Sequence, residues 1–103
     1  SLIKNTTRLP AFVIVEIEIH DQELYRSYTH LTPDTIASYG GEFVVRGGET
    51  ITLEGDWVPE RLVVLKFPTV DTAQEWWDSE AYSKPKKIRQ QAATTKMIIA
   101  AGI

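Results

Sequence analysis

Arg46 stands in the segment Val-Arg-Gly-Gly, where two glycines directly follow a guanidinium side chain. Glycine adopts backbone conformations that other residues resist, and it lets a ligand approach the main chain. A planar guanidinium suits a carboxylate or a phosphate. We therefore expect Arg46 to bind an anionic ligand group; in the alternative, the glycines only form a turn and Arg46 pairs with Glu16, Glu42 or Glu54. Neither Gly-Gly pair continues as a nucleotide-binding loop.

Glu16 and His30 are the candidate catalytic residues, because each could act as a base. Glu16 and Lys66 lie on two predicted strands that neighbour each other, and both are opposite their strand's apolar face. Exclusion of water there would strengthen Glu16 as a general base; the alternative is a structural ion pair with Lys66 or a solvated position at the rim of the sheet. The imidazole of His30 suits a proton shuttle near neutral pH, unless His30 is only a partly buried helix-end residue.

Metal and thiol chemistry have no support in the sequence. The chain has no cysteine, which excludes disulfides, thiolate metal sites and thiol nucleophiles. Its two histidines, His20 and His30, are too far apart to lie on one helix turn as metal ligands. No serine stands in a G-x-S-x-G segment. We expect no metal site and no cofactor.

Aromatic residues gather in the two predicted helical regions. Their polar tips could orient a flat organic ligand between helices and sheet. We expect Tyr39 and Tyr82 to bind such a ligand together with Arg46; the alternative is that these rings only form the core. Of the adjacent Trp76 and Trp77, one should be buried while the other covers the surface or a partner.

The predicted elements follow from the period of the apolar residues. Strands are expected at 11–19, 42–46, 61–67 and 96–101, with an edge strand or hairpin arm around Ile51 and Leu53. The first helix should start at the N-cap Asp21 and end at residue 31, and a new helical turn should follow Thr32 and Pro33.

A second helical region should start at a capping box formed by Asp71 and Gln74, with Val70 as its hydrophobic staple. We expect it to break near Ala81 and to resume over residues 84–93. The basic residues of that second part are expected to form a solvated helix face: Lys84, Lys86, Lys87 and Arg89.

The order strand, helix, strand, strand, helix, strand predicts an α+β fold, a ferredoxin-like split βαβ sandwich with an antiparallel sheet and both helices on one face. Residues 11–103 should form this single domain, after a flexible N-terminal tail of residues 1–10. The uncovered apolar face should pack on a second copy, which predicts a homodimer. Trp57, in a loop, is expected to anchor that interface.

Composition narrows the range of functions. The chain has 103 residues, 43% of them hydrophobic and 24% charged, as in an ordinary small globular domain. A net charge of -3 gives no basic footprint for nucleic acid. The longest apolar stretch is too short to span a membrane. We expect a cytoplasmic protein without nucleic-acid or membrane partners.

Several segments together resemble the domain-of-unknown-function family DUF1330: AFVIVEIEI, SYGGEFVVRGG, LEGDW, RLVVLKFP and SEAY. The resemblance implies membership of the dimeric α/β barrel group, in which two ferredoxin-like protomers join their sheets as a barrel. That group includes cofactor-free monooxygenases, muconolactone-type isomerases, haem-binding enzymes and ligand-sensing domains. The family has no assigned reaction. Pro85 departs from its pattern, in a region where members continue a helix.

These observations support two hypotheses. In the first, the protein binds a small anionic or aromatic metabolite and is either a binding protein or a cofactor-independent enzyme for proton transfer or monooxygenation. Arg46 would then stabilise developing negative charge, with Glu16 or His30 as the base. In the second, it is a non-catalytic binding or assembly module whose marked residues serve turns and dimer packing.

Overall fold

The computed structural model describes residues 9–103. The predicted tail of residues 1–10 therefore lies outside the described residues, except for Leu9 and Pro10. The elements follow in the predicted order, and no cis peptide bond occurs among the described residues.

Four antiparallel strands form one sheet. They are β1 (Ala11–Ile19), β2 (Glu42–Arg46), β3 (Arg61–Phe67) and β4 (Ala93–Ala101), in the order β2-β3-β1-β4. The bounds of the first three agree with the prediction, while β4 begins three residues earlier than predicted. β1 lies between β3 and β4, as its apolar and β-branched composition requires for a central strand.

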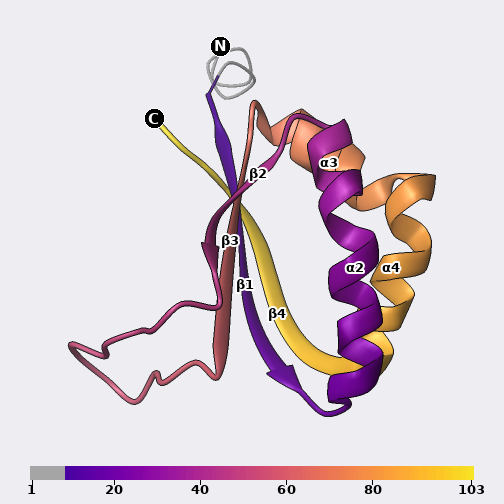
Figure 1. Cartoon of the computed structure of the whole chain (residues 1–103). Helices are drawn as coiled ribbons and strands as arrows, with labels where there is room; N and C mark the ends of the chain where they lie inside the picture. The colour runs from indigo at the N-terminus through magenta and orange to yellow at the C-terminus, as the bar shows by residue number, and fades with distance from the viewer. Residues whose placement is uncertain (1–8) are drawn as a thin grey trace.

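Three helices cover one face of the sheet and leave the other face free of helices (Figure 1). They are α2 (Gln22–Ser38), α3 (Val70–Asp78) and α4 (Glu80–Ala92). The core lies between the two layers. Alternate residues of β1, among them Val13, Val15 and Ile17, point into it and are almost fully buried. The predicted α+β, ferredoxin-like sandwich is confirmed.

α2 runs through Pro33 without a break, so the predicted new turn at Thr32 is wrong. Asp21 is the N-cap, as predicted, and its carboxylate accepts a hydrogen bond from Leu24 N. Residues on both sides of Pro33, including Tyr28 and Ile36, are buried in the core. Their packing outweighs the one backbone hydrogen bond that proline removes.

The second helical region differs from the prediction at three points. The N-cap of α3 is Thr69, whose hydroxyl accepts from Thr72 N, and not a capping box at Asp71. The break falls at Ser79, two residues before the expected position, because its hydroxyl caps α4 by accepting from Tyr82 N. Pro85 lies buried inside α4, which therefore begins before the proline.

Residues 47–60 form a long loop that projects from the body of the molecule on the helix-free side (Figure 1). The predicted strand around Ile51 and Leu53 is wrong: these side chains are 77% and 89% exposed, and no strand pairs with them. Across residues 9–103, no helix combines the length and the apolar character needed to cross a membrane.

Candidate functional site

A cleft opens between α2 and the helix-covered face of the sheet. Its cavity volume is about 30 Å³, and the 440 Å³ of empty space around it includes open solvent, so a ligand would occupy the mouth of the cleft and not an enclosed pocket. Its wall is mostly apolar and aromatic, with contributions from all four strands, α2 and α3. The aromatic members are Tyr25, Tyr28, Phe43 and Trp76, and the charged members are Arg46 and Arg61.

Arg46 and Arg61 bring two positive charges to this cleft from the neighbouring strands β2 and β3. The Arg46 guanidinium lies 4.1 Å from the ring centre of Phe43, and that of Arg61 lies 5.8 Å from the ring centre of Tyr25. Neither forms an ion pair with a carboxylate of residues 9–103. Arg61 Nε is buried without a hydrogen-bond partner there. Arg46 is exposed to solvent, whereas Arg61 is half-buried, so the cleft combines an apolar wall with one half-buried and one solvated guanidinium.

Gly47 leaves room for the Arg61 side chain. Its φ is +72°, in the left-handed region, and its amide donates to the Leu62 carbonyl at 2.8 Å. A Cβ atom at Gly47 would overlap the Arg61 guanidinium. The first glycine of the Val-Arg-Gly-Gly segment forms a turn and also leaves room for a second guanidinium.

Behind the cleft lies a buried polar network of Tyr28, Tyr82, Arg89 and Thr95. The two phenol oxygens are 2.8 Å apart. Arg89 Nε donates to the Tyr82 hydroxyl at 3.2 Å, and Arg89 Nη1 donates to Thr95 Oγ1 at 2.6 Å. Arg89 is only 2% exposed, and its Nη2 has no hydrogen-bond partner in the described chain. Of the four residues, Tyr28 alone lines the cleft.

Burial raises the pKa of the Tyr28 phenol well above its usual value, and the adjacent Tyr82 raises it further. The folded state therefore keeps Tyr28 neutral at pH values where the unfolded chain ionises it. The resulting stability is complete below about pH 10, the ordinary tyrosine pKa, and is lost as the pH rises toward the folded pKa.

We expect this phenol to make the protein less stable in alkali. Above about pH 10 the free energy of unfolding should fall by about 1.4 kcal/mol per pH unit on account of Tyr28 alone. Tyr28→Phe should show a correspondingly shallower fall. Urea unfolding at several pH values measures both slopes, and identical slopes in the two proteins would contradict the shift.

The five predicted site residues do not come together. Arg46 lines the cleft as expected. Tyr82 is fully buried and reaches the cleft only through Tyr28. Tyr39 is the half-buried C-cap of α2, and His30 is exposed on α2; neither lines the cleft.

Glu16 lies on the opposite, helix-free face of the sheet. Its carboxylate accepts a hydrogen bond from Trp57 Nε1, and its Oε1 is 3.9 Å from Lys96 Nζ. The predicted pairing with Lys66 is wrong, because the strand register places Lys66 opposite Phe12.

Sequence reasoning missed Arg61, Tyr28 and Arg89 as candidate site residues, although two of them left a signal. Arg61 lies two residues before Val63 and four before Leu65, which are both buried. Because side chains alternate between the two faces of a strand, this spacing already placed Arg61 on the face that the helices cover. Arg89 continues the helical spacing of the buried α4 residues, which are Tyr82, Pro85, Arg89 and Ala92. The predicted solvated basic face is therefore wrong at Arg89. Trp76 is the buried tryptophan of the adjacent pair, at 1% exposure.

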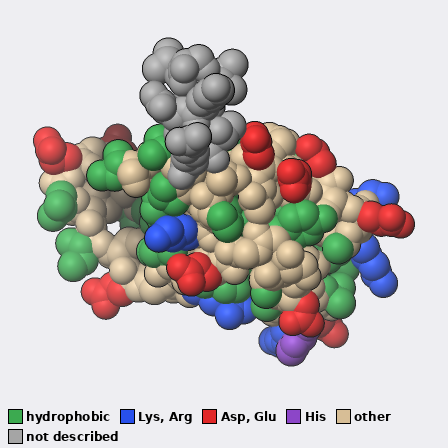
Figure 2. All heavy atoms as spheres, turned by 90° about the horizontal axis from the view of Figure 1, so that it is seen from above, with side chains coloured by type: hydrophobic (Ala, Val, Ile, Leu, Met, Phe, Trp, Pro, Cys, Tyr) green, Lys and Arg blue, Asp and Glu red, His purple; other side chains and the backbone are tan. Residues whose placement is uncertain are grey.

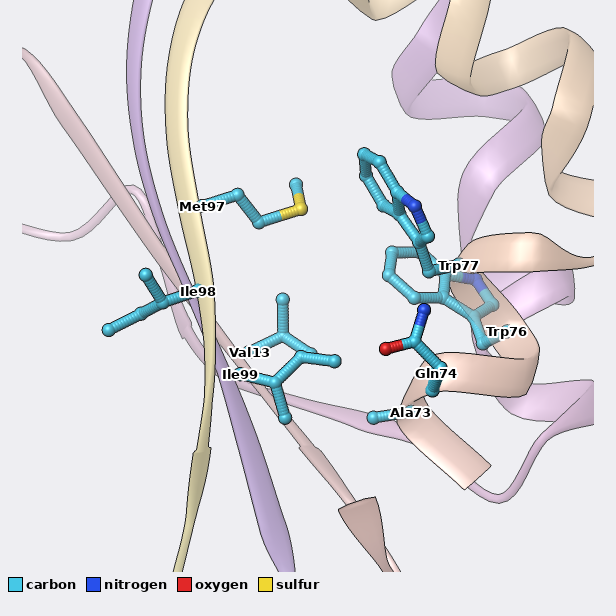
Figure 3. Close-up of a pocket in the computed structure, with 8 residues that line it drawn as sticks. All are labelled: Val13, Ala73, Gln74, Trp76, Trp77, Met97, Ile98 and Ile99. Atoms are coloured by element: carbon cyan, nitrogen blue, oxygen red, sulfur yellow. The ribbon is translucent and has the colours of Figure 1, made fainter. Parts of the chain in front are cut away.

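A second hollow, of about 450 Å³ with its open space, lies between α3 and β4. Figure 3 shows Trp77, Met97 and Ile99 around it, while Ile98 points away to the other side of β4. No charged side chain lines this hollow, so it offers nothing to hold an anionic group. Among the described residues, no three His, Cys, Asp or Glu side chains are grouped as metal ligands.

The comparisons with known proteins agree with this architecture. The sequence profile of a family described as a domain of unknown function, DUF1330, matches residues 10–103. A protein of unknown function from Rhodopseudomonas palustris has a TM-score of 0.77 at 19% identity, over 98% of this chain and 88% of that one. No curated protein matches the sequence.

Two further solved structures share the fold and carry a described or assigned activity. SnoaB, a cofactor-independent oxygenase from Streptomyces nogalater, has a TM-score of 0.63 at 12% identity, over 92% of this chain and 94% of that one. A Nitrosomonas europaea protein, provisionally assigned as an antibiotic biosynthesis monooxygenase, has a TM-score of 0.54 at 11% identity. The shared regions cover 94% of this chain and 92% of that one. At such identities the likeness concerns the fold.

Proposed function

Because the chain belongs to the DUF1330 family and has the ferredoxin-like fold of the dimeric α/β barrel superfamily, we propose that it binds a small, flat, anionic metabolite in the cleft beneath α2. The observation that carries this proposal is the pair of guanidinium groups, Arg46 and Arg61, which line an apolar cleft without a described carboxylate partner.

The chemistry of the wall selects the class of ligand. Aromatic rings and aliphatic side chains favour a flat apolar body, because such a body displaces water from their surfaces. A guanidinium with a buried, unpartnered Nε favours an oxyanion, since an unmade hydrogen bond in a buried site is costly. An aromatic carboxylate or phenolate of one or two rings satisfies both requirements.

Naphthoate and its neutral analogue naphthamide test this proposal. We expect isothermal titration calorimetry to show binding of naphthoate, and Arg61→Ala to weaken that binding about 10- to 100-fold, the usual range for one hydrogen bond to a charged group. The same substitution should weaken the binding of naphthamide much less. Lys66→Ala is the matched control, because it also removes one positive charge from β3 but on an exposed residue outside the cleft.

Equal losses in Arg61→Ala and Lys66→Ala would show that long-range charge, and not the cleft, attracts naphthoate. Absence of naphthoate binding to the unaltered protein would count directly against an aromatic-anion site. Unchanged binding in Arg46→Ala, alongside a loss in Arg61→Ala, would restrict the anion contact to Arg61.

Cofactor-independent proton transfer or oxygenation is a second candidate, supported by the fold shared with SnoaB. Arginines at the cleft would stabilise the anion formed from a phenolic or enolic substrate. The candidate bases His30 and Glu16 do not line the cleft of a single protomer. In this proposal, either residue acts as the base only if dimerisation brings it to the cleft of a partner protomer. An oxygen electrode with a dihydroxynaphthoate as substrate distinguishes this activity from the alternative, a non-catalytic binding module.

We also propose that two protomers pair through the helix-free face of the sheet. The large exposed hydrophobic side chains there and on the 47–60 loop include Val44, Ile51, Leu53, Trp57, Val58 and Ile98. Figure 2 shows hydrophobic side chains standing out at the end of the molecule where the loop projects. Exposed apolar area of this extent is unusual on a monomer, and a second copy would cover it.

A further inference from the structure

The buried phenols behind the cleft hold one proton more than the described residues can accept. Arg89 Nε donates to the Tyr82 oxygen, so that oxygen is already an acceptor. Tyr28 and Tyr82 each carry a phenolic proton, and only one proton can lie between their oxygens, which are 2.8 Å apart. The remaining proton has no acceptor within residues 9–103, although both side chains are buried.

Access to the cleft decides which phenol keeps the spare proton. Tyr82 has no exposed surface, so a free proton there would stay unpaired in the core. Tyr28 is 9% exposed and contributes to the wall of the cleft, so of the two phenols it alone borders space that a ligand could enter. The favourable direction therefore runs from Arg89 to the Tyr82 oxygen and from the Tyr82 hydroxyl to the Tyr28 oxygen. In that direction the proton of Tyr28 is the one left without an acceptor among the described residues.

The charge of Arg89 strengthens the same direction. Its guanidinium is buried, and no carboxylate of the described chain forms an ion pair with it. A cation that donates to a phenol makes that phenol a better donor to the next acceptor, and this polarisation passes along a hydrogen-bonded chain. Buried charge without a counter-ion is costly, so an anion brought near the chain would be favoured.

We propose that Tyr28 is an oxyanion donor of the cleft, and that Tyr82 and Arg89 are positioning residues that hold its proton toward the ligand. This inference rests on the proposed function and deepens it. The ligand oxygen that meets Tyr28 is anionic and attached to a flat ring system, as in an aromatic carboxylate, a phenolate or an enolate. Tyr28 thus adds a neutral donor to the two guanidinium groups of the same site.

The test compares Tyr28→Phe, Tyr82→Phe and the control Tyr39→Phe for binding of naphthoate and naphthamide. Phenylalanine keeps the ring contacts of Tyr82, whose centroid lies 4.0 Å from that of Trp76. Tyr39 is a tyrosine of α2's C-cap outside the cleft, so its variant reports the general effect of losing a hydroxyl. Circular dichroism checks that each variant is folded.

We expect Tyr28→Phe to weaken the binding of naphthoate about tenfold, as for the loss of one hydrogen bond to a charged group. The binding of naphthamide should weaken by a smaller factor. Tyr82→Phe should weaken naphthoate in the same selective way although it does not touch the cleft. If these hydroxyl groups had only a structural role, their loss would weaken the binding of both ligands equally. Equal losses, or unchanged naphthoate binding in Tyr28→Phe, would overturn the inference.

The outcomes separate this inference from the proposed function. If naphthoate binds and depends on Arg61 but not on Tyr28, the cleft is correct and the donor role is wrong. If the unaltered protein does not bind naphthoate, the anion site and the donor role are both wrong.

Discussion

Replacing Trp76 by alanine is expected to lower the free energy of unfolding by about 3–5 kcal/mol, the usual range for truncating a buried aromatic residue. The indole is 1% exposed, lies 4.0 Å and 5.3 Å from the ring centres of Tyr82 and Phe67, and donates to Thr35 Oγ1 at 3.1 Å. Its loss would enlarge the cleft that it lines and would remove one of the two hydrogen bonds of the Thr35 hydroxyl, which still donates to the Thr32 carbonyl. Since small domains have only about 5–15 kcal/mol of stability, this variant should be barely folded.

Trp77→Ala is the matched control, because the two tryptophans are adjacent on α3. Trp77 is half-buried and holds the Lys86 ammonium 4.3 Å from its ring centre, an interaction worth only about 0.5–1 kcal/mol at such a site. We expect a loss about half as large as that of Trp76→Ala. Urea unfolding followed by circular dichroism at one fixed protein concentration measures both. A larger loss for Trp77 would mean that the core is arranged differently.

Replacing Ile98 by glutamate is expected to separate the proposed dimer. Ile98 lies on the helix-free face of β4, opposite Ile14 in the strand register, and is 60% exposed in the protomer. A symmetric interface would contain this residue twice, and burying each isoleucine is worth about 1.5–3 kcal/mol. The dissociation constant should therefore rise by about 100- to 10,000-fold.

Leu31→Glu provides the comparison for that experiment. Leu31 is an apolar residue of α2, 43% exposed, on the helix layer and not on the bare face. Sedimentation velocity across a concentration series should give monomers for Ile98→Glu and unchanged dimers for Leu31→Glu. A monomer in the unaltered protein, or a dimer that persists in Ile98→Glu, would show that this face does not join two copies.

The sequence predicted the fold better than the site. Alternation of apolar residues is a local signal, and it located β1, β2 and β3 to the residue. The errors fall where packing overrides local preference. Pro33 and Pro85 remain inside helices because the residues around them are buried. Ile51 and Leu53 alternate like a strand, but no strand within residues 9–103 pairs with them.

The candidate site was predicted only in part, because it depends on which side chains meet across the two layers. Arg46 was identified from its local glycines. Tyr28, Tyr82 and Arg89 come from two helices far apart in the sequence, and only the packing of α2 on α4 brings them together. Glu16 and Lys66 also depend on long-range structure, because the strand register decides whether they meet. Both were correctly placed away from the core, yet a shift of four residues in register separates them.

Both ends of the 47–60 loop adjoin Arg61, one of the residues that line the candidate site. At its start, Gly47 lies against the Arg61 guanidinium; at its end, the Glu60 carboxylate accepts from Ile19 N at 2.8 Å. A partner that binds the loop would therefore act on the arginine of the proposed anion site. Thermodynamic reciprocity then requires that any factor by which assembly changes ligand affinity is also the factor by which ligand changes assembly. Metabolite concentration could in this way control how many molecules are paired.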